Sequence, residues 1–486
     1  MCSLTPNSIK INEFENLPIN KTILMESTLE FKDKSMISDH LYNSLMKHFN
    51  LKNQNFPTLS SIKKLRKEID EQTPIFRNLN GVYTDAKTKI VNILNEIANS
   101  ETERKTILGL NKKIRIKLTG DGGNVGNLKI LNFTFQLIDF SGSQSVYGNY
   151  TLGIFEVLKE SHEELRISLK EIIESLENFN SITLNNIEHK IEFYLGGDLK
   201  FLANMMGLNA ASSNYPCIWC TCAVDKFHEY RINDWSIHDK SCGARTFEES
   251  FILRAKRTVA ERKGYINKPL ISFIPFERVI IDCVHICLRI SDKLFDHLLQ
   301  DIERLDGGFK IDKISHNVNF CILVDFLENE CKLKNPYYIK DNRYHLRSWD
   351  VRKRLCILAN IDLVKLFPML KDNVAKTHIL RNFCVLHTKI RDNRLDQFEI
   401  KVLTAAYLDS YLELYHCGSI TPYLHCFVSH LHEFRKSYGD FNLFNQQGIE
   451  KLNDLTSQQY YRSTNGSHKD YLNQLMKKRN RMDHYK

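Results

Sequence analysis

The stretch Leu118-Thr-Gly-Asp121-Gly-Gly-Asn-Val-Gly126 places a single acidic residue among glycines at the end of an apolar segment. Upstream of it, basic and apolar residues alternate from Lys113 to Leu118, which is the period expected of a strand with one buried face. Glycines let the backbone come close to a ligand, so a carboxylate at Asp121 suits a metal ion or a phosphate site. The alternative is an aspartate that merely closes a turn, and this stretch alone does not distinguish the two.

The overall composition is that of an ordinary globular protein. The chain has 486 residues, of which 42% are hydrophobic and 26% charged. It contains no run of apolar residues long enough to span a membrane, and its first residues lack the pattern of a secretory signal. We therefore expect no membrane partner and a nuclear or cytoplasmic location. Thirteen cysteines indicate reduced thiols, some bound to metal, and the net charge of +9 mildly favours nucleic acid as a partner.

The order of the elements that follow Asp121 favours one fold class. The alternation of residues predicts a second strand at Lys129–Ile138 and a third at Val146–Phe155. A capping box at Ser161 opens an amphipathic helix, and a fourth strand is expected at Lys190–Leu195. Three antiparallel strands, a crossover helix and a strand parallel to the first make up an RNase-H-like sheet. The predicted fold class is therefore mixed α/β with an RNase-H-like core.

This strand order also predicts a site. Asp198 follows the fourth strand as Asp121 follows the first, and adjacent parallel strands bring their carboxyl ends together. Two carboxylates so close repel each other unless a cation lies between them. Oxygen ligands at an open, glycine-rich site suit Mg²⁺ or Mn²⁺ better than Zn²⁺.

A Cys-x-x-Cys pair, Cys217 and Cys220, predicts half of a zinc site or a redox motif. The best candidates for the other half are His425 and His430, whose spacing falls in the range of structural zinc ligands. Such a site would pin together the two ends of a large, mostly helical insertion. The competing ligands are Cys222, His228, His238, Cys242 and the group Cys283, His285 and Cys287.

Glu450 lies in a predicted helix beyond these histidines, and a zinc clamp would return that helix to the sheet. Three carboxylates could then hold two metal ions for an in-line phosphoryl displacement. Basic residues follow Glu450 and would form a DNA-facing helix, although a charged, solvated C-terminal end explains them equally well. They are Lys451, Arg462, Lys469, Lys477, Lys478, Arg479 and Arg481.

Taken together, these motifs resemble the catalytic core of the Transib transposases, which also occurs in the recombination-activating protein that cuts antigen-receptor genes. The resemblance covers roughly residues 110–465 and follows the order of that family. Its segments are Asp121-Gly122, Phe193–Lys200, Cys217–Cys220, Ile281–Ile286, Tyr423–His430 and Glu450.

The resemblance implies a DDE-type DNA transposase and endonuclease that nicks DNA beside terminal inverted repeats, forms hairpins and joins the excised ends to target DNA. It implies a homodimer, and an accessory protein subunit is a candidate partner. The implied catalytic residues are Asp121, Asp198 and Glu450, which would coordinate two Mg²⁺ or Mn²⁺ ions. The implied ligands of one structural Zn²⁺ are Cys217, Cys220, His425 and His430.

The expected organisation has five segments. They are a loosely ordered extension (1–58) with one helix around Met36–His48, a helical dimerisation or DNA-binding segment (59–110), the first part of the core (111–210), the helical zinc-binding insertion (211–430) and the part with the Glu450 helix and a basic tail (431–486). Residues 1–58 show no DNA-end-recognition domain like that of longer family members. The alternative is therefore a domesticated, transposon-derived DNA-binding or regulatory protein that keeps the zinc site but has lost catalysis.

Overall fold

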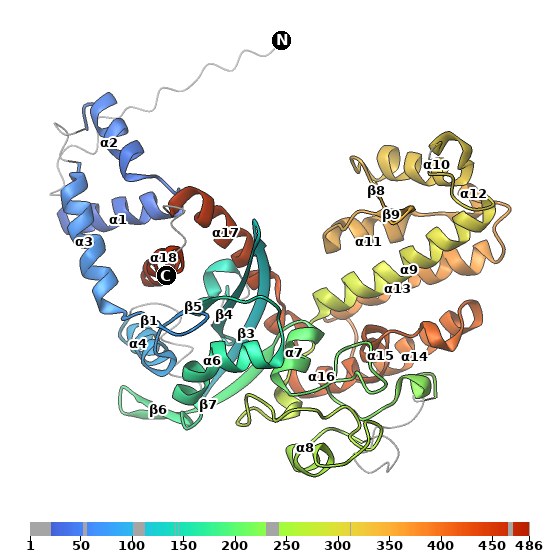
Figure 1. Cartoon of the computed structure of the whole chain (residues 1–486), viewed down its shortest axis with the longest axis horizontal. Coiled ribbons are helices and arrows are strands. Elements are labelled where there is room, and N and C mark those ends of the chain that lie inside the picture. The colour runs from blue at the N-terminus through green and yellow to red at the C-terminus, as the bar shows by residue number, and fades with distance from the viewer. Residues whose placement is uncertain are drawn as a thin grey trace.

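A mixed sheet of seven strands lies beside a largely helical body (Figure 1). The computed structural model describes residues 21–51, 56–100, 112–140, 142–143, 145–229, 243–311, 313–464 and 470–485. The strand order is β1-β2-β5-β4-β3-β7-β6. The strands are β1 (Phe76–Arg77), β2 (Gly81–Tyr83), β3 (Lys113–Val125), β4 (Leu128–Leu137), β5 (Tyr150–Glu156), β6 (Ser181–Leu184) and β7 (Ile187–Gly196).

The predicted order of the four central strands is confirmed. β3, β4 and β5 pair antiparallel in sequence, and β7 pairs parallel with β3 on its other side. Helix α6 (His162–Leu176) makes the crossover, and its apolar side is buried against the sheet. The sequence did not predict β6, which forms a hairpin with β7, or the short strands β1 and β2.

Strand β3 does not end at Asp121, as the sequence predicted, but continues to Val125. The glycine-rich segment stays extended because β4 pairs with it, placing Asp121 opposite Asn132. Gly120 is needed for close packing, since a Cβ atom there would lie 2.4 Å from the ring of Phe201. The turn comes only at Gly126, which has a φ of 62°.

In the middle of β3, from Ile116 to Gly120, both faces are buried, although the alternating sequence predicted one exposed face. Lys117 and Thr119 on the polar face are fully buried. The segment that leads into helix α17 (Gln447–Ser463) covers them: Lys117 Nζ donates to the carbonyl oxygens of Phe444 and Asn445, at 3.1 and 2.9 Å. A segment more than 300 residues away in the sequence therefore completes this face of the sheet.

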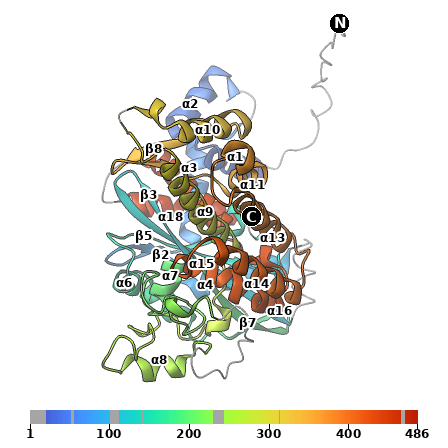
Figure 2. The same cartoon turned by 90° about the vertical axis from the view of Figure 1, so that its right-hand side faces the viewer.

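The helical body contains long helices and one small hairpin. Figure 2 shows α14, α15 and α16 side by side, in agreement with their contacts. The elements are α7 (Leu199–Met205), α8 (Phe247–Arg254), α9 (Cys283–Leu305), α10 (Val318–Asp325), β8 (Tyr337–Lys340), β9 (Arg343–Leu346), α11 (Val351–Asn360), α12 (Leu363–Leu366), α13 (Asn373–Arg391), α14 (Gln397–Leu414), α15 (Pro422–Ser429) and α16 (Leu431–Tyr438). Among the described helices, none has the length and apolar character needed to cross a bilayer.

The described part of residues 1–58 is helical. The helix expected around Met36–His48 is present at Asp39–His48, whereas Lys21–Lys34 is a helix where the sequence predicted a loosely ordered extension. Buried side chains such as Leu29 and Met46 pack these helices against the next one. The helices on this side are α1 (Lys21–Lys34), α2 (Asp39–His48), α3 (Leu59–Gln72) and α4 (Ala86–Asn99). Apolar packing among α1, α2 and α3 explains the order, because it offsets the polar composition of the segment.

Helix α18 (Tyr471–His484) packs against α1 and α3 and bonds to α4 through Lys89 (Figure 1). For three residues of the predicted DNA-facing basic tail, this placement corrects the prediction. Lys478, Arg479 and Arg481 are buried, and Arg481 is paired with Asp33 and Asp70 at 2.7 and 2.6 Å. These cations therefore hold the C-terminal helix in place. Lys469 lies outside the described residues.

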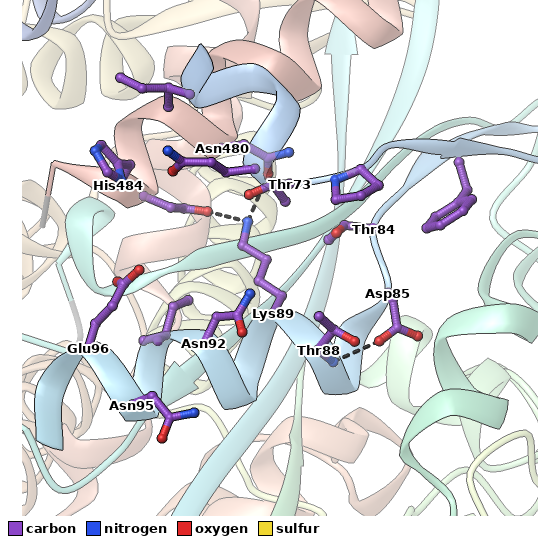
Figure 3. A pocket seen from close by; sticks show the side chains of 16 residues that line it. Thr73, Thr84, Asp85, Thr88, Lys89, Asn92, Asn95, Glu96, Asn480 and His484 are labelled. Carbon is purple, nitrogen blue, oxygen red and sulfur yellow. Dashed lines mark hydrogen bonds and ion pairs between the residues drawn. The ribbon is translucent and has the colours of Figure 1, made fainter. Parts of the chain in front are cut away.

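Buried Lys89 bonds to Asn480 on α18, as Figure 3 shows, and also ties this helix to the sheet. Its Nζ atom donates to Thr151 O at 2.8 Å, to Asn480 Oδ1 at 2.9 Å and to Asp483 Oδ2 at 2.5 Å. Since Thr151 belongs to β5 and Lys89 to α4, one ammonium group links three elements. The C-terminal helix is therefore packed against the sheet.

Candidate functional site

The register of β3 and β7 brings two of the predicted acids to the same place. The last parallel pair is Thr119 opposite Gly196. Asp121 and Asp198 each lie two residues beyond it, side by side at the same end of the two strands. Asp198 also caps helix α7, where its Oδ1 accepts a hydrogen bond from Phe201 N at 2.7 Å.

The third predicted acid comes from helix α17, which packs across β3. Glu450 lies in the first turn of this helix. The carboxylates of Asp198 and Glu450 both act electrostatically on Asp121, so the three acids belong to one charged cluster. One turn after Glu450, Asn453 Nδ2 donates to Asp121 Oδ2 at 2.7 Å.

The electrostatics of this cluster favour a bound cation. Burial raises the pKa of Asp121 to about 7, and the negative charges of Asp198 and Glu450 act in the same direction. Burial also raises the pKa of Glu450. Crowded carboxylates of this kind keep their charge more easily when a cation binds between them, and all-oxygen donors fit Mg²⁺ or Mn²⁺.

His285 belongs to the same cluster, and the sequence interpretation had grouped it with zinc candidates instead. It follows Asp282, the N-cap of α9, and its Nδ1 lies 2.5 Å from Asp282 Oδ2. Its Nε2 lies 4.0 Å from Glu450 Oε1. Burial lowers its pKa, but Asp282, Asp198 and Glu450 outweigh this and raise it to about 9. The Asp-x-x-His spacing, one helical turn, is the signal that could have revealed this pair.

Glu160 is a fourth acid near the cluster that sequence reasoning missed. It lies between β5 and α6, and its Oε2 pairs with Lys200 Nζ at 2.8 Å. Burial raises its pKa, and the charge of Asp198 adds to the effect. No periodicity or motif marks this residue, because its position depends on how the loop folds back over β3.

The four predicted zinc ligands form a second, separate cluster. Their ligand atoms all lie within 4.8 Å of one another, and all four side chains are buried. Cys217 Sγ is 3.3 Å from His430 Nε2, and Cys220 Sγ is 3.3 Å from His425 Nε2. Tetrahedral zinc with bonds of about 2.3 Å to sulfur and about 2.0 Å to nitrogen requires separations of about 3.5 Å. The residues therefore fit one zinc ion.

The surroundings of this cluster are those of a structural zinc site. His430 Nδ1 lies 3.0 Å from Glu433 Oε2, so a carboxylate orients the imidazole. His425 stacks on Phe227 with ring centroids 4.0 Å apart. Four protein ligands leave no open coordination position for a substrate.

The zinc cluster is also joined to the sheet. Trp219, between the two cysteines, donates from Nε1 to Val279 O at 2.6 Å. Val279 bridges to Leu195 on β7, and Ile280 N donates to Leu195 O at 2.8 Å. The site therefore fastens both ends of the helical insertion beside the strand that leads to Asp198.

The competing zinc ligands are not part of this cluster. Cys222 and His228 are absent from the group of described residues that could share one ion, and Cys283 and Cys287 are buried in α9. His238 and Cys242 lie outside the described residues. In the part of the chain that the structure describes, the Cys₂His₂ cluster is the one group of His, Cys, Asp or Glu residues whose ligand atoms all lie within 4.8 Å of one another. The ligand atoms of the three acids lie further apart.

No protein-family model and no curated protein matches this chain. The chemistry of the two clusters is thus the basis for any functional conclusion. One is an oxygen-rich, partly buried group of acids with an adjacent imidazole. The other is a closed Cys₂His₂ site suited to hold the fold together.

Proposed function

We propose that this protein is a metal-dependent DNA endonuclease and strand transferase of the DDE type, like the Transib transposases that its motifs resemble. The observation that carries this proposal is geometric: Asp121 and Asp198 follow neighbouring parallel strands, and Glu450 lies on the helix whose Asn453 bonds to Asp121. The strand order β5-β4-β3-β7, with only β7 parallel to β3, supports an RNase-H-like core.

In this proposal Asp121, Asp198 and Glu450 hold two Mg²⁺ or Mn²⁺ ions. When bound, such ions activate the attacking hydroxyl and stabilise the leaving oxygen of a phosphodiester. In nicking, a water oxygen bonds to phosphorus while the bond to the 3′ oxygen breaks, which leaves a 3′-hydroxyl and a 5′-phosphate. In strand transfer, the oxygen of that 3′-hydroxyl would bond to phosphorus in another strand. The bond from that phosphorus to its own 3′ oxygen would break, which leaves a new 3′-hydroxyl on the attacked strand.

The chain's own residues supply the arrangement for this chemistry. Asp198 is fixed by its bond to the backbone of α7, and Asp121 by its bond to Asn453. His285 is held beside Glu450 by its contact with Asp282. The Cys₂His₂ site would hold one Zn²⁺ and keep the insertion in place next to β7. The substrate is double-stranded DNA, which the net charge of +9 favours.

The test is cleavage of nicked and branched duplex DNA in Mg²⁺ and in Mn²⁺ by the wild type and by Asp198→Ala. Asp225→Ala, an acid on the short helix at Val224–Lys226, is the matched control. We expect nicks or hairpins from the wild type and the control, and none from Asp198→Ala. Equal cleavage by Asp198→Ala would contradict the assignment of the acids. DNA binding without cleavage by the wild type would favour the domesticated DNA-binding protein instead.

A further inference from the structure

We propose that Asn453 is a positioning residue that fixes the Asp121 carboxylate, and with it the register of Glu450, for divalent-cation binding. This inference rests on the metal role proposed above for the acids. Asn453 itself would not bind the cation. Its side chain would set which oxygen of Asp121 is free to do so.

The hydrogen bonds around Asn453 form a chain from the sheet to the acid. Asn132 Nδ2 donates to Asn453 Oδ1 at 2.6 Å, and Asn453 Nδ2 donates to Asp121 Oδ2 at 2.7 Å. Asn132 is 1% exposed, and it also reaches Thr456 Oγ1 at 3.3 Å. Because an ionised carboxylate can only accept hydrogen bonds, Asp121 orients the Asn453 amide with its NH₂ group towards the acid. Asn453 Oδ1 then faces Asn132, which donates to it.

The backbone is built to admit this side chain. Asp121 and Asn132 are direct cross-strand partners on β3 and β4, so their side chains stand side by side on one face of the sheet. A Cβ atom at Gly123 would lie 3.3 Å from the Cβ and Cγ atoms of Asn453. A larger residue at Gly123 would therefore crowd Asn453.

Two consequences follow for the cluster of acids. With Oδ2 of Asp121 held by Asn453, Oδ1 is the oxygen left for a cation. Asn453 also lies three residues after Glu450 on α17, so both side chains project from neighbouring positions of the helix. A single hydrogen bond therefore aligns the first acid with the third.

A second contact, between β3 and the N-cap of α17, does not involve the acids and provides a control. Thr119 Oγ1 donates to Gln446 Oε1 at 2.7 Å, and Gln446 is 2% exposed. Removing this bond weakens the same interface between helix and sheet. It leaves the hydrogen bond between Asn453 and Asp121 intact.

The experiment compares Asn453→Ala with Gln446→Ala in the full-length protein. Mn²⁺ affinity is measured by calorimetry without DNA, and zinc content and thermal unfolding are measured on the same samples. We expect both variants to lower the melting temperature and to retain zinc. We expect only Asn453→Ala to weaken Mn²⁺ binding, by about 10-fold to 100-fold, as for other partners of metal ligands.

Equal Mn²⁺ affinity in the two variants would overturn the role of Asn453 while leaving the proposed function intact. If Asp121→Ala binds Mn²⁺ as tightly as the wild type does, both the role of Asn453 and the proposed function are overturned. If Asn453→Ala does not fold, Asn132→Ser serves instead, because it frees the Asn453 amide to turn away from Asp121. It is then expected to weaken Mn²⁺ binding several-fold, and unchanged binding would overturn the inference.

Discussion

At the scale of single residues, Lys117 shows how far the sequence can be trusted. The alternation of basic and apolar residues around Lys117 correctly predicted a strand. The same pattern predicted that the Lys117 side chain is exposed to solvent. In the structure it is fully buried, and burial lowers its pKa to about 7. The sequence could not show this, because the carbonyl groups that it meets belong to Phe444 and Asn445 near the other end of the chain.

Lys117 gives a prediction for the pH dependence of stability. Its pKa in the folded state is below that of an ordinary lysine, so the unfolded chain holds the extra proton between about pH 7 and about pH 10. The stability that Lys117 contributes therefore rises with pH across this window, by up to about tenfold in the folding equilibrium per pH unit. Chemical denaturation at several pH values should show this rise in the wild type and a smaller one in Lys117→Met. Identical slopes would contradict the burial of a neutral lysine.

At the scale of elements, the metal ligands were more predictable than the strands and helices that carry them. The Cys-x-x-Cys pair and the spaced histidines are local patterns, and the structure brings all four ligand atoms together. The end of strand β3 was predicted wrongly, because the glycine-rich segment stays extended by pairing with β4. The burial of three basic residues on α18 was not predicted either, because it depends on helices far away in the sequence, such as α1 and α3. His285 was grouped with the zinc candidates: its spacing from Asp282 is a local signal, but its proximity to Glu450 on another element is not visible in the sequence.

The zinc cluster predicts that replacing the sulfur atom of one cysteine ligand strongly lowers zinc content and stability. Cys217→Ser should lose bound zinc and much of the stability of the insertion, because structural zinc contributes folding free energy directly. Cys222→Ser is the matched control, since Cys222 is equally buried but outside the cluster. Zinc content by mass spectrometry and thermal unfolding check the pair. Equal zinc content and equal melting temperatures in both variants would rule out this site.

At the scale of the whole molecule, α17 connects the acids to a basic cavity of about 490 Å³ between α1, α3 and α18. Three of its cations, Lys32, Arg66 and Arg481, pair with aspartates. Arg462 and Lys477 also line it. Arg462 is twelve residues after Glu450, or about 18 Å along a helix. A length of about 18 Å corresponds to about five base pairs of duplex DNA, because each base pair adds about 3.4 Å along the duplex axis.

This arrangement predicts that duplex DNA lying across the acids also contacts the cavity. The double variant Arg462→Ala, Lys477→Ala should bind duplex more weakly. The slope of the logarithm of the binding constant against the logarithm of salt concentration should fall by about one to two released counterions. Binding is measured by fluorescence anisotropy without divalent metal, over a series of salt concentrations. Arg166→Ala, an exposed arginine on α6, is the control and should change neither quantity. An unchanged salt slope in the double variant would place the DNA elsewhere.

The central claim is that the acids of β3, β7 and α17 form a divalent-cation site. Anomalous diffraction from crystals soaked in Mn²⁺ tests it most directly, because it locates manganese and zinc separately. We predict manganese between the carboxylates of Asp121 and Asp198, with a second ion about 3.5–4 Å away, and zinc at the Cys₂His₂ cluster. Zinc in its cluster with no manganese at the acids would contradict the claim.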